Sequence, residues 1–137
     1  MEFLGLNTKG VQEQMIVPLS DEKSILVIEE AVYTFYLPYA FTIEDLYLSV
    51  NTAALDANIT VDINVENSSI FSNLLTIDGG DYHSKDATTA YSIITNKGNI
   101  GAHKKISIDL DAVGLTGTEG KGLKLIIAGR RSTTLDL

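Results

Sequence analysis

The sequence predicts an all-β protein, an antiparallel jelly-roll-like β-sandwich with a short N-terminal arm. Apolar and polar residues alternate with a period of two in several segments, which is typical of strands with one buried and one wet face. Clusters of Gly, Asn and Asp separate these segments and supply turns. No convincing stretch shows the period of a helix, and many short strands with regular turn spacing favour a sandwich or jelly roll.

The length of 137 residues predicts a single domain with a core that forms without covalent staples. Residues 1–13 carry little periodicity, so we interpret them as an arm that becomes ordered against a neighbouring molecule. Residues 14–137 are the predicted sandwich domain. Its first strands are expected in the apolar runs 14–19 and 24–30 and in the aromatic run 32–37.

Alternation is clearest in three later segments, residues 45–50, 59–66 and 105–111. The run "ITVDINVE" places Ile59, Val61, Ile63 and Val65 on one face of a strand and polar residues on the other. Further strands are predicted at 68–73, 90–95 and 123–129. The last is apolar on both faces, and we expect it to be covered on both sides. The stretch 109–115 is predicted to form one helical turn.

Composition excludes several classes of function. The net charge is -8, so a phosphate-binding surface rich in Lys and Arg is not expected, and with it no nucleic-acid partner. The chain has no cysteine, which rules out disulfides and thiolate chemistry and fits a reducing compartment. No apolar run reaches the roughly 20 residues of a membrane span, and the N-terminus does not resemble a secretory signal.

Loop motifs and acidic residues give weak signals for chemistry. The loop "LTGTEGKG" resembles a phosphate-binding loop, but Leu115 and Gly122 stand where that motif needs Gly and Ser or Thr. The turn "DGGDYHSKD" (78–86) gathers oxygen ligands without the EF-hand spacing, so a calcium site there is an open alternative to a solvated turn. The paired carboxylates Asp109 and Asp111 are expected on a wet strand face. We therefore predict no enzyme and no catalytic, cofactor-binding or metal-binding residues.

The segment "VYTFYLPYAF" (32–41) holds five of the ten aromatic residues and one of the two prolines. Both faces of a strand through Tyr33 and Tyr36 are bulky, and Pro38 must interrupt its ladder. One face can serve the core, and the other then needs a second layer or another subunit. Because Tyr is favoured at interfaces, we interpret Tyr33, Tyr36 and Tyr39 as partner-binding residues. A corner of the core and a sugar-stacking platform are the alternatives.

Residues 36–131 resemble a module of tailed-bacteriophage virion proteins. The shared elements are "LPYAFTIEDLYLSVNTA", an "ITVDINV" strand, "SNLLTIDGGDYHS" and the closing "KKISIDLDAVGLTGTEGKGLKLIIAGRR". The resemblance implies a small jelly-roll-like sandwich that acts as a fibre domain or as a free-standing decoration protein. The short leader, without a shaft, favours a capsid decoration (cement) subunit located in the virion, which assembles in the bacterial cytoplasm.

The expected partners are the major capsid protein or other virion proteins, together with further copies of the chain in a homo-oligomer, a trimer in such particles. In the arm, Phe3, Leu4 and Leu6 are the expected contact residues. The alternative function is a receptor- or glycan-binding head or tail fibre module that uses the loops at 78–86 and 114–122. A small hydrolase is the third hypothesis, although no Gly-x-Ser-x-Gly motif is present.

Overall fold

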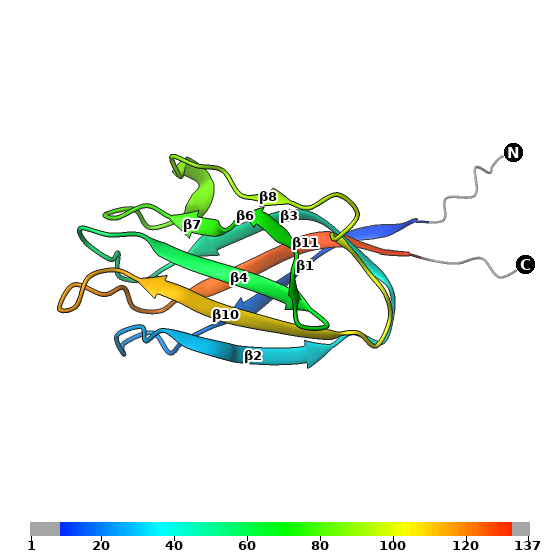
Figure 1. Ribbon diagram of the computed structural model, residues 1–137, viewed down its shortest axis with the longest axis horizontal. Coiled ribbons are helices and arrows are strands. Elements are labelled where there is room, and N and C mark those ends of the chain that lie inside the picture. The colour runs from blue at the N-terminus through cyan, green and yellow to red at the C-terminus, as the bar shows by residue number, and fades with distance from the viewer. Residues whose placement is uncertain (1–8, 133–137) are drawn as a thin grey trace, which may run out of the picture.

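The computed structural model describes residues 9–132, and these form a sandwich of two antiparallel β-sheets (Figure 1). The β1 sheet contains, in spatial order, β1 (Lys9–Pro18), β11 (Lys124–Ser132), β3 (Phe41–Ser49) and β9 (Asn99–Ile100). The β2 sheet contains β2 (Glu29–Tyr36), β10 (Lys105–Val113), β4 (Ile59–Val65) and β5 (Ser68–Ser69), with β7 (Leu75–Ile77) also paired to β4. The strands β6 (Phe71–Asn73) and β8 (Ser92–Ile93) form a separate pair, and η1 (Ser84–Asp86) is a single 3-10 turn.

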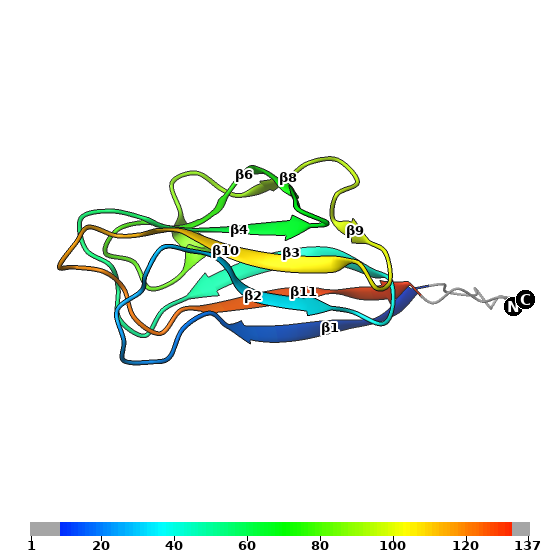
Figure 2. The same ribbon diagram turned by 60° about the horizontal axis from the view of Figure 1, so that its bottom comes forward.

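The order of the strands is that of a jelly roll. The first four strands alternate between the two sheets, and so do β9, β10 and β11 near the end of the chain. Figure 2 shows the two layers stacked with the long strands running along them. Since every strand pair is antiparallel and crossing connections wrap both sheets, the predicted all-β jelly-roll-like sandwich is confirmed.

The core lies between the sheets and is filled by the inward-facing rows of the central strands. In β10 and β4 the buried residues include Ile106, Ile108 and Ile63, each less than 3% exposed. From the β1 sheet, Leu48 and Leu125 face them and are completely buried. These rows are the ones that the period-two alternation predicted, because successive side chains of a strand point to opposite faces.

Gly129 allows the β1 sheet to close tightly. A Cβ atom at this position would lie 2.1 Å from the carbonyl oxygen of Thr42 and 2.6 Å from the ring of Phe41. Only glycine fits between β11 and β3 at this point, and its absence of a side chain lets the Phe41 ring fill the core.

At one edge of the β1 sheet, the part of β3 that β9 does not pair with is covered by the long connection from β7 to β9. Side chains of this connection take up the backbone N–H groups of β3, with Leu48 donating to Ser84 Oγ at 2.9 Å and Leu46 donating to Tyr91 OH at 3.2 Å. The N–H of Val50 donates to the carbonyl of Tyr82 at 2.9 Å. The opposite edge, β1, has no such cover among the described residues.

Three local expectations differ from the structure. β1 begins at Lys9, so residues 9–13 of the expected arm are paired with β11. Residues 24–28 are not a strand: Leu26 inserts into the core while its neighbours stay exposed, and β2 starts at Glu29. The helical turn expected at 109–115 is wrong, because β10 continues to Val113 through a bulge beside Leu110.

Candidate partner-binding surface

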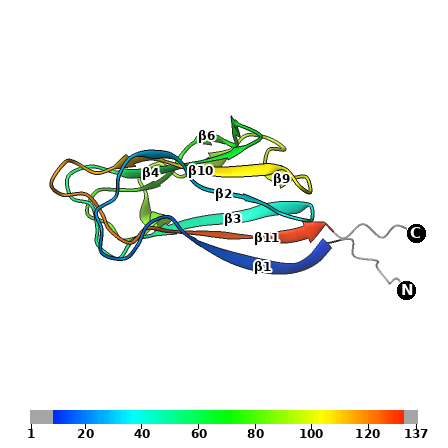
Figure 3. The same cartoon turned by 90° about the horizontal axis from the view of Figure 1, so that it is seen from below.

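β2 is an edge strand on the side of the sandwich that also carries β1. Within residues 9–132 it pairs with β10 and with no other strand. Figures 1 and 3 place β1 and β2 on the same side of the molecule, each at the edge of its own sheet. Its β-branched and aromatic residues suit a strand that is buried on one face only.

The two faces of β2 have different environments. Tyr33 and Phe35 stand opposite the buried Ile108 and Ile106, and their rings meet edge to face with centroids 5.8 Å apart. Phe35 is half-buried against the core, whereas Tyr33 is 41% exposed at its margin. Tyr36 faces the other way, and it is 59% exposed. The bulky residues thus divide between core and solvent.

Tyr39 differs from the other two predicted tyrosines. It follows the bend at Pro38, is half-buried, and packs against the core. The guanidinium of Arg131 lies 4.0 Å from the centre of its ring, and Arg131 Nε donates to Glu13 at 2.6 Å. This hydrogen bond from Arg131 lowers the pKa of the Glu13 carboxyl. One face of Tyr39 is therefore occupied within the chain.

Exposed apolar side chains are concentrated in one part of the chain, which runs from β1 through the β1–β2 connection to β2. Among the described residues eleven large apolar or aromatic side chains are exposed, and seven of them lie between Val11 and Tyr36. We call these seven the β1–β2 surface: Val11, Ile16, Ile25, Val27, Ile28, Tyr33 and Tyr36. A concentration of this kind is typical of an interaction site, whereas scattered single residues are ordinary.

A bulge fixes the beginning of β2. Ala31 has a positive φ of 51° and its N–H donates to Asp109 Oδ1 at 2.8 Å. The second oxygen of Asp109 accepts from the side-chain amide of Asn64 at 2.9 Å. The carboxylate of Asp109 was expected to be solvated, but it holds the bulge of the edge strand through these two hydrogen bonds.

The outer face of the β2 sheet is acidic. Asp62 on β4 lies directly opposite Asp109 on β10, and Asp62 accepts a hydrogen bond from Ser69 Oγ at 2.5 Å. Partial burial, and secondarily the charge of Asp109, raise the pKa of Asp62. Partial burial, followed by the charges of Asp62 and Asp109, raises the pKa of Asp111. The carboxylates on this face destabilise one another when they are all ionised.

The turn at residues 78–86 is organised by its own hydrogen bonds. Asp78 accepts from both the N–H and the hydroxyl of Thr88, at 2.7 Å and 2.8 Å. Asp78 also lines a recess of about 680 Å³ together with Asp56 and Asn58. Within residues 9–132 no three His, Asp or Glu side chains are grouped as a metal site requires. The turn therefore offers a polar recess at the loop end of the sandwich.

The predicted interface residues fall into three groups. Tyr33 and Tyr36 lie on the β1–β2 surface, Tyr39 lies apart from it under Arg131, and Phe3, Leu4 and Leu6 lie outside the described residues. Sequence reasoning missed the five other members, namely Val11, Ile16, Ile25, Val27 and Ile28. The outward position of Ile16 follows from the alternation of 14–19. The exposure of Val27 and Ile28 could not be predicted from the sequence, because an apolar run such as 24–30 is typical of a buried strand.

Residues 9–132 contain no helix with the length and hydrophobicity that a membrane crossing requires. Comparisons of the chain with protein-family models, with curated proteins and with solved structures find no match.

Proposed function

We propose that this chain is a structural protein of a bacteriophage virion, a decoration (cement) subunit that binds the capsid shell non-covalently. The observation that carries the proposal is the β1–β2 surface: its seven exposed apolar and aromatic side chains belong to β1, to β2 and to the connection between them, and these two strands are edge strands on the same side of the sandwich. Burying such side chains against a partner is favourable by about 25 cal/mol per Å² of apolar area. The resemblance to virion modules supplies the kind of partner, a shell built of major capsid protein.

The fold suits a subunit that has to remain folded on the outside of a particle. Its core is continuous between the two sheets, and the chain's loops gather at the ends of the strands. The net charge of -8 keeps copies displayed on neighbouring particles from associating nonspecifically. No reaction is assigned to the chain in this proposal.

The arm adds a second contact. Residues 1–8, with Phe3, Leu4 and Leu6, directly precede β1, which belongs to the same side of the sandwich as the β1–β2 surface. We propose that these apolar side chains bind a neighbouring shell subunit.

The test is occupancy on capsids that lack the protein. Purified protein is mixed with such shells, pelleted, and quantified per particle, and the bound copies are located by cryo-electron microscopy. The variant Val27→Ser/Ile28→Ser/Tyr36→Ser is expected to lose at least about tenfold in affinity, because three anchors are removed from the contact. The matched control Leu115→Ser/Tyr82→Ser removes exposed apolar groups from loops elsewhere and should bind normally.

A deletion of residues 2–8 tests the arm separately, since it leaves every described strand intact. Weaker occupancy is expected. Full occupancy by both the triple variant and the deletion variant would contradict the proposal.

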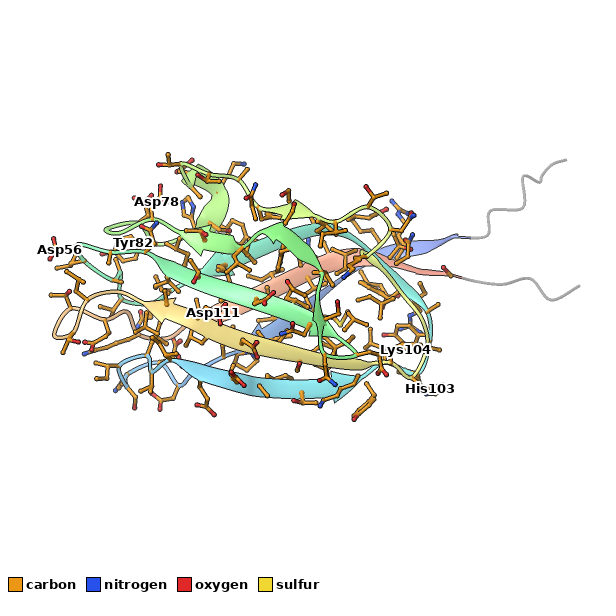
Figure 4. All side chains as sticks on the ribbon, viewed as in Figure 1. Asp56, Asp78, Tyr82, His103, Lys104 and Asp111 are labelled. Atoms are coloured by element: carbon orange, nitrogen blue, oxygen red, sulfur yellow. The ribbon has the colours of Figure 1, made fainter. Side chains whose placement is uncertain are left out.

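A second function, glycan or receptor binding at a fibre tip, is favoured by the loop recess. It combines carboxylate, amide and hydroxyl groups, and Tyr82, which is 58% exposed, belongs to the same turn (Figure 4). Polar side chains and an exposed ring are the usual components of a sugar site, and here the turn 78–86 supplies both, with Asp78 lining the recess and Tyr82 lying outside its lining. Binding on a glycan array that disappears with Tyr82→Ala would favour this function over decoration.

A further inference from the structure

Within the described part of the chain, residues 9–132, the stretch 32–36 of β2 pairs with β10 on one side and presents a strand edge on the other without any of the usual protections. The segment "VYTFY" contains no charge, no proline and no glycine. The bulge at Ala31 lies before it and Pro38 lies after it, so neither interrupts this stretch. Natural sheets usually protect exposed edges with charges, prolines or bulges, because unpaired N–H and C=O groups are a template for another strand.

We propose that this segment pairs antiparallel with the same segment of a second copy of the chain. Centring the pair on Thr34 places Val32 of each copy opposite Tyr36 of the other, which uses the whole unprotected stretch. The two β2 sheets would then continue into one another across a two-fold axis. The proposed pair is a dimer, because an edge that pairs antiparallel with itself has two-fold symmetry, and in this it differs from the trimer that the resemblance implies.

The charges at the two ends of β2 select a second copy as the occupant. β2 begins with the exposed Glu29 and Glu30. It ends beside basic residues, since Lys105 stands opposite Tyr36 and the N–H of His103 donates to the carbonyl of Leu37. Figure 4 shows His103 and Lys104 together at the end of the sandwich where β2 finishes.

Antiparallel pairing brings these opposite charges together twice. The acidic start of each β2 comes next to the basic end of the other, whereas parallel pairing would bring like charges together. Complementary charges of this kind fix the orientation of an interface more than they raise its affinity. Within one chain the two charged groups lie at opposite ends of the same strand, so they cannot satisfy each other.

The exposed aromatic side chains of β2 also gain partners. Tyr33 of one copy lies opposite Phe35 of the other, on the face that each strand turns toward its core. Cross-strand aromatic pairs stabilise sheets beyond backbone hydrogen bonding. The pairing thus covers the side of Tyr33 that the single chain leaves exposed.

The first experiment uses the absence of cysteine in the chain. The variant Thr34→Cys places one thiol at the proposed axis, where opposed Cα atoms of antiparallel strands are about 4.5–5.5 Å apart, within disulfide range. Mild oxidation should give a covalent dimer of twice 14.8 kDa. Gln14→Cys, an exposed position on β1, is the matched control and should remain monomeric under denaturing electrophoresis.

The second experiment exchanges the charges. Glu30→Lys and Lys104→Glu, each alone, should weaken the dimer roughly tenfold in sedimentation at about 0.15 M salt, and the double variant should recover it. The double variant recovers the dimer only if Glu30 of one copy lies next to Lys104 of the other copy, as the proposed pairing requires.

Two results would contradict the proposed pairing. The pairing is overturned if the natural chain sediments as a monomer up to millimolar concentration, or if Thr34→Cys crosslinks no faster than Gln14→Cys. These measurements contain no capsid, so they succeed or fail independently of the proposed function.

Discussion

The two edge strands β1 and β2 lie on the same side of one sandwich, yet only one of them is protected. β1 has a bulge between Lys9 and Gln12, ends at Pro18, and carries the charged and partly exposed Glu13 on the same row as Met15 and Val17, which face the core. All three are devices that discourage pairing with another strand. The second half of β2 has none of them, so the chain leaves one backbone edge available and closes the other.

This difference suggests separate roles for the two strands. β1 exposes Val11 and Ile16, which are 81% and 67% exposed, but its edge is unsuited to accept a strand. It can offer side chains to a shell. β2 can offer its backbone as well, which is the kind of contact that a second copy satisfies. The proposals for shell binding and for self-pairing therefore use different properties of one surface.

The largest effect is expected from the inward face of β2. Phe35→Ala should lower the free energy of unfolding by about 2–3 kcal/mol, because a half-buried ring is removed from the core. Its neighbour Tyr36→Ala should change it by less than about 0.5 kcal/mol, since that side chain faces solvent. Urea denaturation of both variants measures the difference. Equal losses would mean that β2 does not divide its residues between core and partner.

The sequence predicted the central strands well and the edges poorly. The alternation in 59–65 and 105–111 identified the buried rows correctly, because a single period decides which side chains face the core. The prediction of a strand through residues 24–28 was wrong, because an apolar run does not reveal that only Leu26 enters the core. Residues 123–129 were expected to be covered on both sides, but Ile126 is half-buried between Ile16 and Tyr47 on the outer face.

The candidate surface was predicted only in part for a similar reason. Tyr33 and Tyr36 were identified from their aromatic character. Whether a strand lies at an edge, however, depends on pairing with residues about 70 positions away, as between β2 and β10. The stacking of Arg131 on Tyr39 likewise joins segments from opposite ends of the domain. Such contacts leave no local pattern in the sequence.

A smaller effect is expected from removing the protection of β1. Glu13→Val replaces the charge on this row with an apolar side chain while Arg131 keeps its contact with Tyr39. We expect concentration-dependent species larger than the dimer in sedimentation, because a second edge becomes available for pairing. Gln14→Val adds the same side chain at an exposed outer position and should not associate further. Association of both variants alike would show that added hydrophobicity, rather than loss of the charge, is responsible.

The smallest effect separates the two sheets by their response to pH. The folded-state pKa of Asp62 and Asp111 lies above the ordinary value of 3.8, so the folded state binds these protons more tightly than the unfolded state. The destabilisation from this face is therefore fully present above the folded-state pKa, and it is relieved as the pH falls through that pKa toward 3.8. Glu13 has the opposite sign: its folded-state pKa lies below 4.5, and its stabilising pair with Arg131 is lost as the pH falls through that value.

Thermal unfolding between pH 3 and pH 8 measures both effects. The midpoint should rise by no more than about 2 °C from pH 7 to pH 5 and then fall below about pH 4. Part of the rise comes from the general decrease of the -8 net charge, which every variant shares. The variant Asp62→Asn isolates the part of the rise that comes from the acidic face. Its amide oxygen can still accept from Ser69, while the repulsion with Asp109 is removed. This variant should be more stable than the natural chain at pH 7 and show a flatter rise; an unchanged profile would mean that the acidic face is fully relaxed by solvent.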